Sequence, residues 1–180
     1  MLKINTKLHL IEDISYLPSD NYDLRPDNID IDTIIIHCIS LPEGAYDNEN
    51  VSDLFTNKLD IAKDKTFLSL KGLRVSSHLF IRRNGVLSQF VPFNMRAWHA
   101  GVSQYKGREN YNDFSIGIEL EGTSSSIFTE EQYSKLREVI KIMKTCYPKI
   151  VENNIIGHNK VSPERKEDPG KFFEWDKIKG

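Results

Sequence analysis

Two histidines and one aspartate in this sequence have the chemistry to hold a metal ion together. His37 lies near the end of the β-branched run 32–39, His158 directly follows the short apolar run 154–157, and Asp168 lies in the charged loop beyond it. Two neutral imidazoles and one carboxylate suit zinc with an open fourth position. No HExxH pair supports the assignment, and a histidine at the end of a strand can equally be structural. Spacing alone leaves both interpretations open.

Two carboxylates, Glu119 and Glu121, are candidates for acid–base chemistry. They occupy alternate positions of an apolar run, so a strand there places both on one face, opposite Ile118 and Leu120. Burying a carboxylate is costly unless it is paired or functional, and the alternative is a solvated sheet face. Paired carboxylates also cleave glycosides, but near neighbours on one strand do not flank a scissile bond.

Cys38, beside His37, could be a nucleophile only if a base reached its thiol. Adjacent strand residues point to opposite faces of a sheet, so His37 is poorly placed for that task. We interpret Cys38 as a small buried side chain. Cys146 is the other cysteine, and no CxxC pair is present. Two isolated thiols indicate reduced cysteines in a cytoplasm rather than a disulfide.

The polar segment 92–113 contains a group of aromatic and cationic side chains, namely Trp98, His99, Tyr105 and Arg108. We expect a long loop there, and long loops within compact domains are usually functional. Such side chains bind sugars by stacking and peptide carboxylates by ion pairing, although they would equally well pack the loop. The sequence has neither a Walker loop nor GxGxxG, so no nucleotide cofactor is predicted.

Strands and helices that are interspersed along the chain, with a hairpin among them, must position these residues. Apolar and β-branched runs predict strands at 32–39, 114–120 and 154–157, and Asn84-Gly85 predicts a hairpin between 77–83 and 86–91. We expect helices at 50–59, from the capping box 129–132 to Pro148, and in a last turn at 172–178. Loops are expected at 18–30, 60–72 and 159–171. This order favours the α+β class, with one domain over 1–180 and a mixed central β-sheet with flanking helices.

The composition is that of an ordinary globular chain. The 180 residues carry 24 Lys and Arg against 26 Asp and Glu, a net charge of −2, so no overall basic field attracts nucleic acid or anionic lipid. No strictly apolar run is long enough to span a membrane. The first residues place Lys7, His9 and Glu12 where a signal peptide needs apolar residues. We therefore expect a cytoplasmic protein.

Several longer motifs resemble a known family. They are RAWHAGVSQY at 96–105, NDFSIGIELEG at 112–122, and Gly157-His158 followed by Lys166 and by DPG at 168–170. With further matches between about Pro18 and Trp175, the chain resembles the AmpD family of bacterial zinc-dependent N-acetylmuramoyl-L-alanine amidases, amidase type 2. The resemblance implies a mixed sheet flanked by helices, as in peptidoglycan recognition proteins and a phage lysozyme of the amidase type.

The resemblance also implies roles for the candidate residues. His37, His158 and Asp168 are expected to bind zinc. Glu119 is expected to be the general base, and Lys166 is expected to stabilise the transition state. Zinc activates water and polarises a carbonyl, which is the chemistry that amide hydrolysis needs.

Three residues are expected to contact substrate. Arg74 and Arg108 can pair with carboxylates of the stem peptide, and Trp98 can form a wall for the sugar. Two positions depart from the family pattern: Cys38 stands where an asparagine is common, and Asn110 stands where an arginine occurs.

Family members cleave the amide between the lactyl group of muramic acid and L-alanine. The AmpD branch prefers 1,6-anhydro-muropeptides in cytoplasmic cell-wall recycling, and the missing signal peptide and reduced cysteines agree with that branch. We expect a monomer that binds an anhydro-muropeptide, without nucleic acid or membrane insertion. One alternative is a module that recognises peptidoglycan fragments without cutting them, which would be marked by loss of a ligand or the base. The other is a periplasmic or phage-encoded amidase that acts on intact wall.

Overall fold

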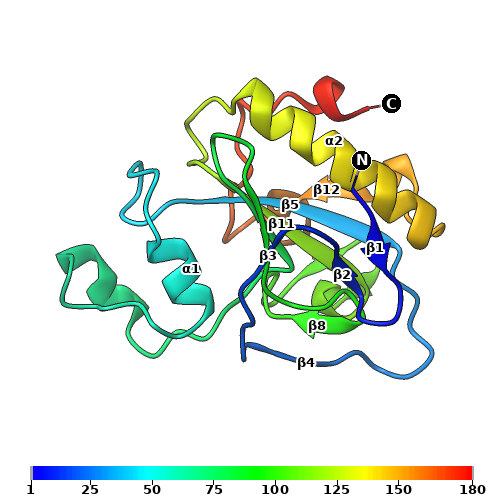
Figure 1. Cartoon of the computed structure of the whole chain (residues 1–180), viewed down its shortest axis with the longest axis horizontal. Helices are drawn as coiled ribbons and strands as arrows, with labels where there is room; N and C mark the ends of the chain where they lie inside the picture. The colour runs from blue at the N-terminus through cyan, green and yellow to red at the C-terminus, as the bar shows by residue number, and fades with distance from the viewer. Residues whose placement is uncertain (1, 180) are drawn as a thin grey trace.

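The computed structural model describes residues 2–179 and has a six-stranded mixed sheet at its centre (Figure 1). The strands lie in the order β12-β5-β11-β6-β7-β3. Neighbouring strands are parallel except for the antiparallel pair β6–β7. Their bounds are Ser15–Tyr16 (β3), Thr33–Ile39 (β5), Leu79–Ile81 (β6), Leu87–Gln89 (β7), Ser115–Glu121 (β11) and Ile155–Gly157 (β12). The predicted α+β class and mixed sheet are confirmed.

The remaining elements are short, apart from one helix. Two-stranded antiparallel sheets pair Ile4–Asn5 (β1) with Leu10–Ile11 (β2), Tyr22–Leu24 (β4) with Met95–Ala97 (β8), and Gln104–Tyr105 (β9) with Arg108–Glu109 (β10). The α-helices are Asn50–Phe55 (α1), Glu130–Cys146 (α2) and His158–Val161 (α3). The 3-10 helices are Lys65–Leu70 (η1), Tyr111–Asp113 (η2), Glu152–Asn154 (η3) and Trp175–Ile178 (η4).

Helix α2 covers one face of the central sheet (Figure 1). It begins at the predicted capping box, in which the Thr129 hydroxyl accepts from the Gln132 backbone N–H and the Gln132 side chain accepts from the Thr129 backbone N–H. Its apolar side chains pack on alternate residues of β5 and β11. This core includes Ile34, Ile36, Ile116, Ile118, Leu120, Tyr133, Leu136, Val139, Ile140 and Met143.

The opposite face of the sheet carries the polar residues singled out above. Because strand residues alternate between faces, the neighbours of these core isoleucines, His37 on β5 and Glu119 on β11, point away from α2. The parallel register sets His37 directly beside Glu119. Helix α1, whose Val51, Leu54 and Phe55 are buried, packs beside this face with Phe80 and Phe90.

Four expected loops contain regular structure. Part of 18–30 forms β4, which pairs with β8 inside the predicted loop 92–113. The sequence did not indicate β4 because its three residues are too few for an alternation of apolar and polar side chains to be recognised as a strand. Likewise, 60–72 contains η1 and 159–171 begins inside α3. The predicted hairpin between β6 and β7 is confirmed.

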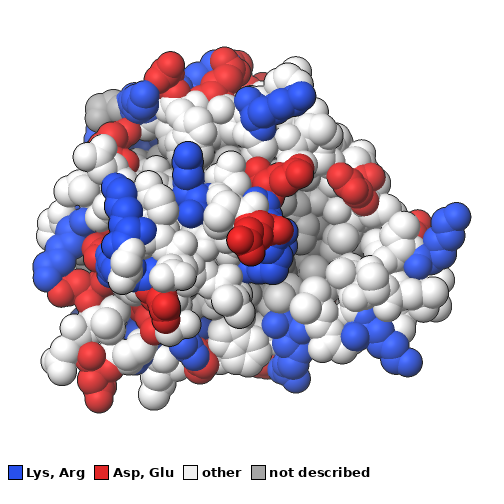
Figure 2. Space-filling view, turned by 180° about the vertical axis from the view of Figure 1, so that it is seen from behind, with Lys and Arg blue, Asp and Glu red and all other residues white. Residues whose placement is uncertain are grey.

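The surface carries both signs of charge. Seen from behind, lysines and arginines lie interspersed with aspartates and glutamates over the visible face (Figure 2). Within residues 2–179, none of the helices has the length and apolar character needed to cross a membrane.

Candidate metal centre

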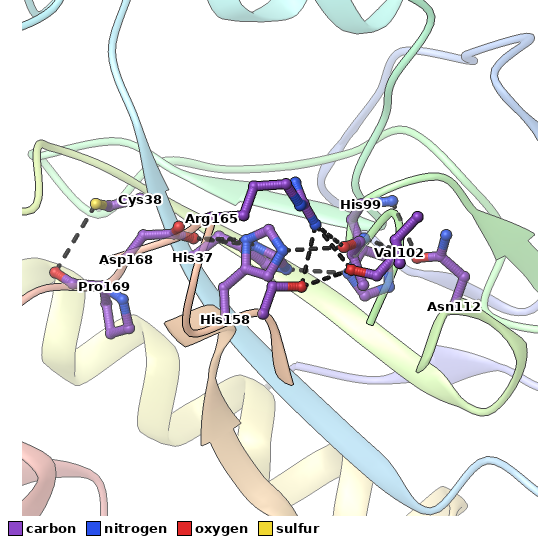
Figure 3. A network of polar contacts seen from close by, with 11 residues as sticks. His37, Cys38, His99, Val102, Asn112, His158, Arg165, Asp168 and Pro169 are labelled. Atoms are coloured by element: carbon purple, nitrogen blue, oxygen red, sulfur yellow. Dashed lines mark hydrogen bonds and ion pairs between the residues drawn. The ribbon is translucent and has the colours of Figure 1, made fainter. Parts of the chain in front are cut away.

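Three side chains from separate segments meet at one point: His37 from β5, His158 from the start of α3, and Asp168 from the loop that follows (Figure 3). The two Nδ1 atoms lie 2.9 Å apart. The Oδ2 atom of Asp168 lies 3.1 Å from Nδ1 of His37 and 3.0 Å from Nδ1 of His158. Both histidines are buried, and Asp168 is partly exposed. The structure thus brings the three predicted ligands together.

The hydrogen bonding of these residues fits a bound cation. Nε2 of His158 lies 3.1 Å from the Ala100 carbonyl oxygen. That oxygen can only accept, so Nε2 carries the hydrogen and Nδ1 presents a lone pair. Burial, followed by the nearby His158, lowers the pKa of His37 to about 4, so its imidazole is neutral near pH 7.

Two imidazole lone pairs and a carboxylate oxygen in such close contact need a positive charge among them. Three atoms at this mutual spacing can each lie about 2.0–2.2 Å from one ion, as zinc requires of nitrogen and oxygen ligands. The donor set of His37, His158 and Asp168 therefore fits a divalent metal ion.

Glu121, the second carboxylate of β11, is fully engaged in holding the fold. Its Oε1 accepts from the backbone N–H of Asp47 at 2.9 Å, and its Oε2 accepts from the backbone N–H of Arg83 at 3.0 Å. Both carboxylate oxygens are thus used in hydrogen bonds to backbone N–H groups, which makes Glu121 a structural residue.

Glu119 is in a different environment. Its Oε2 atom is buried and has no hydrogen-bond partner among residues 2–179. Burial, and then the charge of Asp168, raises the pKa of Glu119 well above its usual value, whereas the charge of Lys166 opposes that rise. A carboxylate beside the triad with an unused oxygen and a raised pKa is suited to accept and return a proton.

A cleft opens beside Asp168, and Lys166 is one of its lining residues, with Cys38, Ser40, Glu43 and Thr123. Lys166 is half-buried and lies on the loop that follows α3. The loop that supplies Asp168 thus also places a cation at the edge of the site.

Cys38 faces away from its neighbour His37, as the alternation along β5 predicts. It packs against the core on the α2 side, and its Sγ lies 3.8 Å from the Pro169 carbonyl oxygen. Burial, with the charges of Glu119 and Asp168 adding to it, raises the pKa of the Cys38 thiol far above its usual value. A thiol that stays protonated is a poor nucleophile. Cys38 and Cys146 are both free cysteines in the structure.

The structure places the expected substrate contacts in different settings. Arg74 is exposed, and Trp98 is half-buried at the start of the segment that leads to the site. The guanidinium of Arg108 pairs with Asp32 at 3.0 Å, so it would have to leave this partner to bind a substrate carboxylate. Asn110 has a φ of 56°, a left-handed conformation that asparagine tolerates better than most residues.

Sequence reasoning missed the place of His99, which was expected to lie in a binding loop. The structure buries it and turns its ring toward the site (Figure 3), with Nδ1 at 3.0 Å from Nε2 of His37. Gly117 on β11 was the available signal, because a glycine within a strand often marks the close approach of another group. A Cβ at Gly117 would lie 2.5 Å from the His99 ring.

Comparison with known proteins agrees with this geometry. Residues 27–171 match the family model described as N-acetylmuramoyl-L-alanine amidase. The 1,6-anhydro-N-acetylmuramyl-L-alanine amidase AmpD of Escherichia coli is 47% identical over 163 residues, which are 91% of this chain and 88% of that protein. A crystal structure of a selenomethionine derivative of AmpD matches with a TM-score of 0.92 at 45% identity, over 95% of each chain. E. coli AmiD, in complex with anhydro-N-acetylmuramic acid-L-Ala-D-γ-Glu-L-Lys, matches with a TM-score of 0.60 at 28% identity, over 86% of this chain and 59% of that one. The chain therefore belongs to the N-acetylmuramoyl-L-alanine amidase family and has the AmpD fold.

Proposed function

We propose that this protein is a zinc hydrolase that cleaves the amide between the lactyl group of 1,6-anhydro-N-acetylmuramic acid and L-alanine, in the recycling of peptidoglycan. The observation that carries the proposal is the convergence of His37, His158 and Asp168, with Glu119 beside His37 on the next strand. The similarity to AmpD along most of the chain supports the anhydro-muropeptide as substrate.

The reaction needs a stronger nucleophile than water and a stronger electrophile than an amide. Zinc held by His37, His158 and Asp168 would lower the pKa of water and polarise the carbonyl. Glu119 takes the proton of the attacking water and passes it to the leaving amine of L-alanine. Its burial raises its pKa well above the usual value of a carboxyl, which strengthens it as a base for the proton of water.

Lys166 is proposed to face the oxygen of the scissile carbonyl as negative charge develops there. Its place on the loop of Asp168, at the edge of the same cleft, supports this role. A fixed cation aimed at developing charge stabilises the transition state more than the ground state.

The outer part of the substrate is assigned to three residues that do not line the cleft beside Asp168. We propose that Arg74 and Arg108 pair with carboxylates of the stem peptide and that Trp98 lies against the sugar. The exposed Arg74 would give up the hydrogen bond from its Nε to Oδ1 of Asn21 at 3.2 Å, whereas Arg108 must exchange Asp32 for the substrate.

The proposal covers the whole molecule. We propose that residues 1–180 form one amidase domain that acts as a monomer in the cytoplasm on free anhydro-muropeptides. Binding of nucleic acid and insertion into membranes have no part in this function.

The test is an assay of the purified protein on a defined anhydro-muropeptide and, in parallel, on polymeric sacculi, with products identified by mass spectrometry. We expect rapid release of the stem peptide from the anhydro-muropeptide and little release from sacculi. Comparable release from sacculi would instead indicate an amidase of intact wall. Binding of the anhydro-muropeptide without cleavage would indicate a recognition module.

A further inference from the structure

One short segment contacts both histidines of the metal centre on the side away from the metal-facing nitrogens. His99 meets Nε2 of His37 at 3.0 Å, and the carbonyl oxygen of Ala100 meets Nε2 of His158 at 3.1 Å. Figure 3 shows His99 on one side of the two histidines and Asp168 on the other. The segment follows β8 and has no part in the proton transfers described above.

The hydrogen bonds beyond His99 determine which of its nitrogens carries the hydrogen. The Ser115 hydroxyl oxygen lies 2.5 Å from the Tyr111 carbonyl oxygen, and two oxygens this close need a hydrogen between them. The Ser115 hydroxyl therefore donates to Tyr111, and its oxygen is left to accept from Nε2 of His99 at 3.2 Å. Nδ1 of His99 then has a lone pair and can only accept.

This lone pair settles the tautomer of His37. Its Nε2 must donate to Nδ1 of His99, so the hydrogen of the neutral His37 ring is on Nε2. Its Nδ1 is then free of hydrogen and faces Asp168 and His158. In the other tautomer, Nδ1 of His37 would carry a hydrogen and could not bind a metal ion.

The segment is also held firmly in place. The side-chain oxygen of Asn112 accepts from the backbone N–H of His99 at 3.2 Å and from that of Ala100 at 2.8 Å. Gly117 leaves the space that the His99 ring occupies against β11. From the other side, the Arg165 guanidinium donates to the Ala100 carbonyl oxygen at 2.8 Å.

We propose that His99 is a positioning residue of the metal centre, which holds His37 in the tautomer with a free Nδ1. It does so because Ser115, which donates to Tyr111, accepts from Nε2 of His99 and leaves Nδ1 of His99 to accept from His37. The proposal rests on the metal site of the proposed function. Groups that orient metal-binding histidines in this way typically contribute about 10- to 100-fold in metal affinity.

The test compares two variants of the full chain. His99→Phe keeps a ring of similar size but removes both nitrogens. His99→Asn retains an acceptor, because its side-chain oxygen can take the place of Nδ1 and accept from His37. Zinc affinity is measured by competition with a chromophoric chelator, and folding is checked by thermal denaturation.

We expect His99→Phe to bind zinc about 10- to 100-fold more weakly than the wild type, and His99→Asn to lie much closer to the wild type. Equal zinc affinity in His99→Phe and the wild type would overturn the proposal. Equal weakening in both variants would also overturn it, because packing and not the acceptor would then be the cause. If the wild type itself binds no zinc, the metal site of the proposed function fails instead.

A second measurement needs no variant. Long-range ¹H–¹⁵N NMR of the zinc-loaded wild type distinguishes the two neutral tautomers of His99. We expect hydrogen on Nε2 of His99, which donates to Ser115, and none on Nδ1, which accepts from His37. Hydrogen on Nδ1 of His99 would contradict the proposal, whether or not His99→Phe folds.

Discussion

At the scale of single residues, the two glutamates of β11 have different roles: Glu119 is the proposed base, and Glu121 stabilises the fold. Glu119→Gln removes the proposed base, so we expect turnover to fall by roughly 10²–10⁴ with zinc content unchanged. The folded-state pKa of Glu119 is raised above its unfolded value by burial. Glu119 therefore lowers the stability of the fold once the pH rises above its unfolded-state pKa, and the neutral amide should leave the metal-free protein at least as stable as the wild type near pH 7.

Glu121→Gln is the matched control. Its amide nitrogen would face one of two backbone N–H donors, Asp47 or Arg83, so a hydrogen bond is replaced by repulsion. We expect a loss of about 1–3 kcal/mol in the free energy of unfolding, with near-normal turnover in the folded enzyme. The reverse result, a stable but inactive Glu121→Gln enzyme and an active Glu119→Gln enzyme, would show that the base is wrongly assigned.

Lys166→Met tests the proposed stabilisation of the transition state. The substitution keeps the length of the side chain and removes its charge. We expect kcat to fall by roughly 10²–10³, with KM little changed, because the contact forms mainly in the transition state. Steady-state kinetics and metal analysis on the same sample are the measurement. A normal kcat with a strongly raised KM would make Lys166 a binder of substrate carboxylate, and normal values of both would make it a surface charge.

Cys38→Ser tests whether the thiol next to a metal-binding histidine takes part in the reaction. Because Cys38 faces the α2 side and burial raises the pKa of its thiol, we expect most of the wild-type turnover to remain. Thiol alkylation should not inactivate the wild type. Rapid stoichiometric inactivation, with modified Cys38 identified by mass spectrometry in folded protein, would argue for a cysteine nucleophile.

At the scale of elements, the partly buried Arg25 joins segments that are far apart in the sequence. Its guanidinium donates to the backbone carbonyl oxygens of Phe93, Asn112, Asp113 and Ser115, at distances of 2.9–3.3 Å. It thus connects the segment after β4 with Phe93, with the last two residues of η2 and with the first residue of β11.

Arg25→Met should therefore leave several carbonyl oxygens without a donor. We expect the free energy of unfolding to fall by about 2–4 kcal/mol, as measured by chemical denaturation. Lys141→Met, on the exposed side of α2, is the control and should change it by less than about 0.5 kcal/mol. Equal effects in the two variants would show that the Arg25 hydrogen bonds add nothing to stability.

The elements that the sequence predicted are those marked by a local signal, either a periodic pattern or a short motif. The alternation in 115–121, the capping box before α2 and the Asn84-Gly85 turn are local signals, and each marked an element that the structure contains. Strands β4 and β8 are short and stabilised by each other. Their pairing joins residues that are far apart in the sequence, so no local pattern could reveal it.

At the scale of the whole molecule, the site is a product of topology. β5 and β12 are parallel neighbours, so His37 and His158 reach the same end of the sheet, and the loop after α3 returns Asp168 to them. The sequence offered these residues as a possible metal site because of their types and because each histidine ends an apolar run. It could not determine the distances, and it could not show that His99 belongs with them, because that depends on the packing of a loop against Gly117.

The most direct test of the central claim is to remove the metal and restore it while following one bond. The wild type is treated with a chelator, dialysed, and titrated with zinc, and the products from a defined anhydro-muropeptide are identified by mass spectrometry at each step. We predict that release of a peptide with a free L-alanine amine stops on removal of the metal and returns in proportion to zinc, up to one ion per chain, whereas His37→Ala recovers neither zinc nor activity. Full cleavage by the metal-free protein, cleavage at a different bond, or full zinc content and activity in His37→Ala would contradict the account.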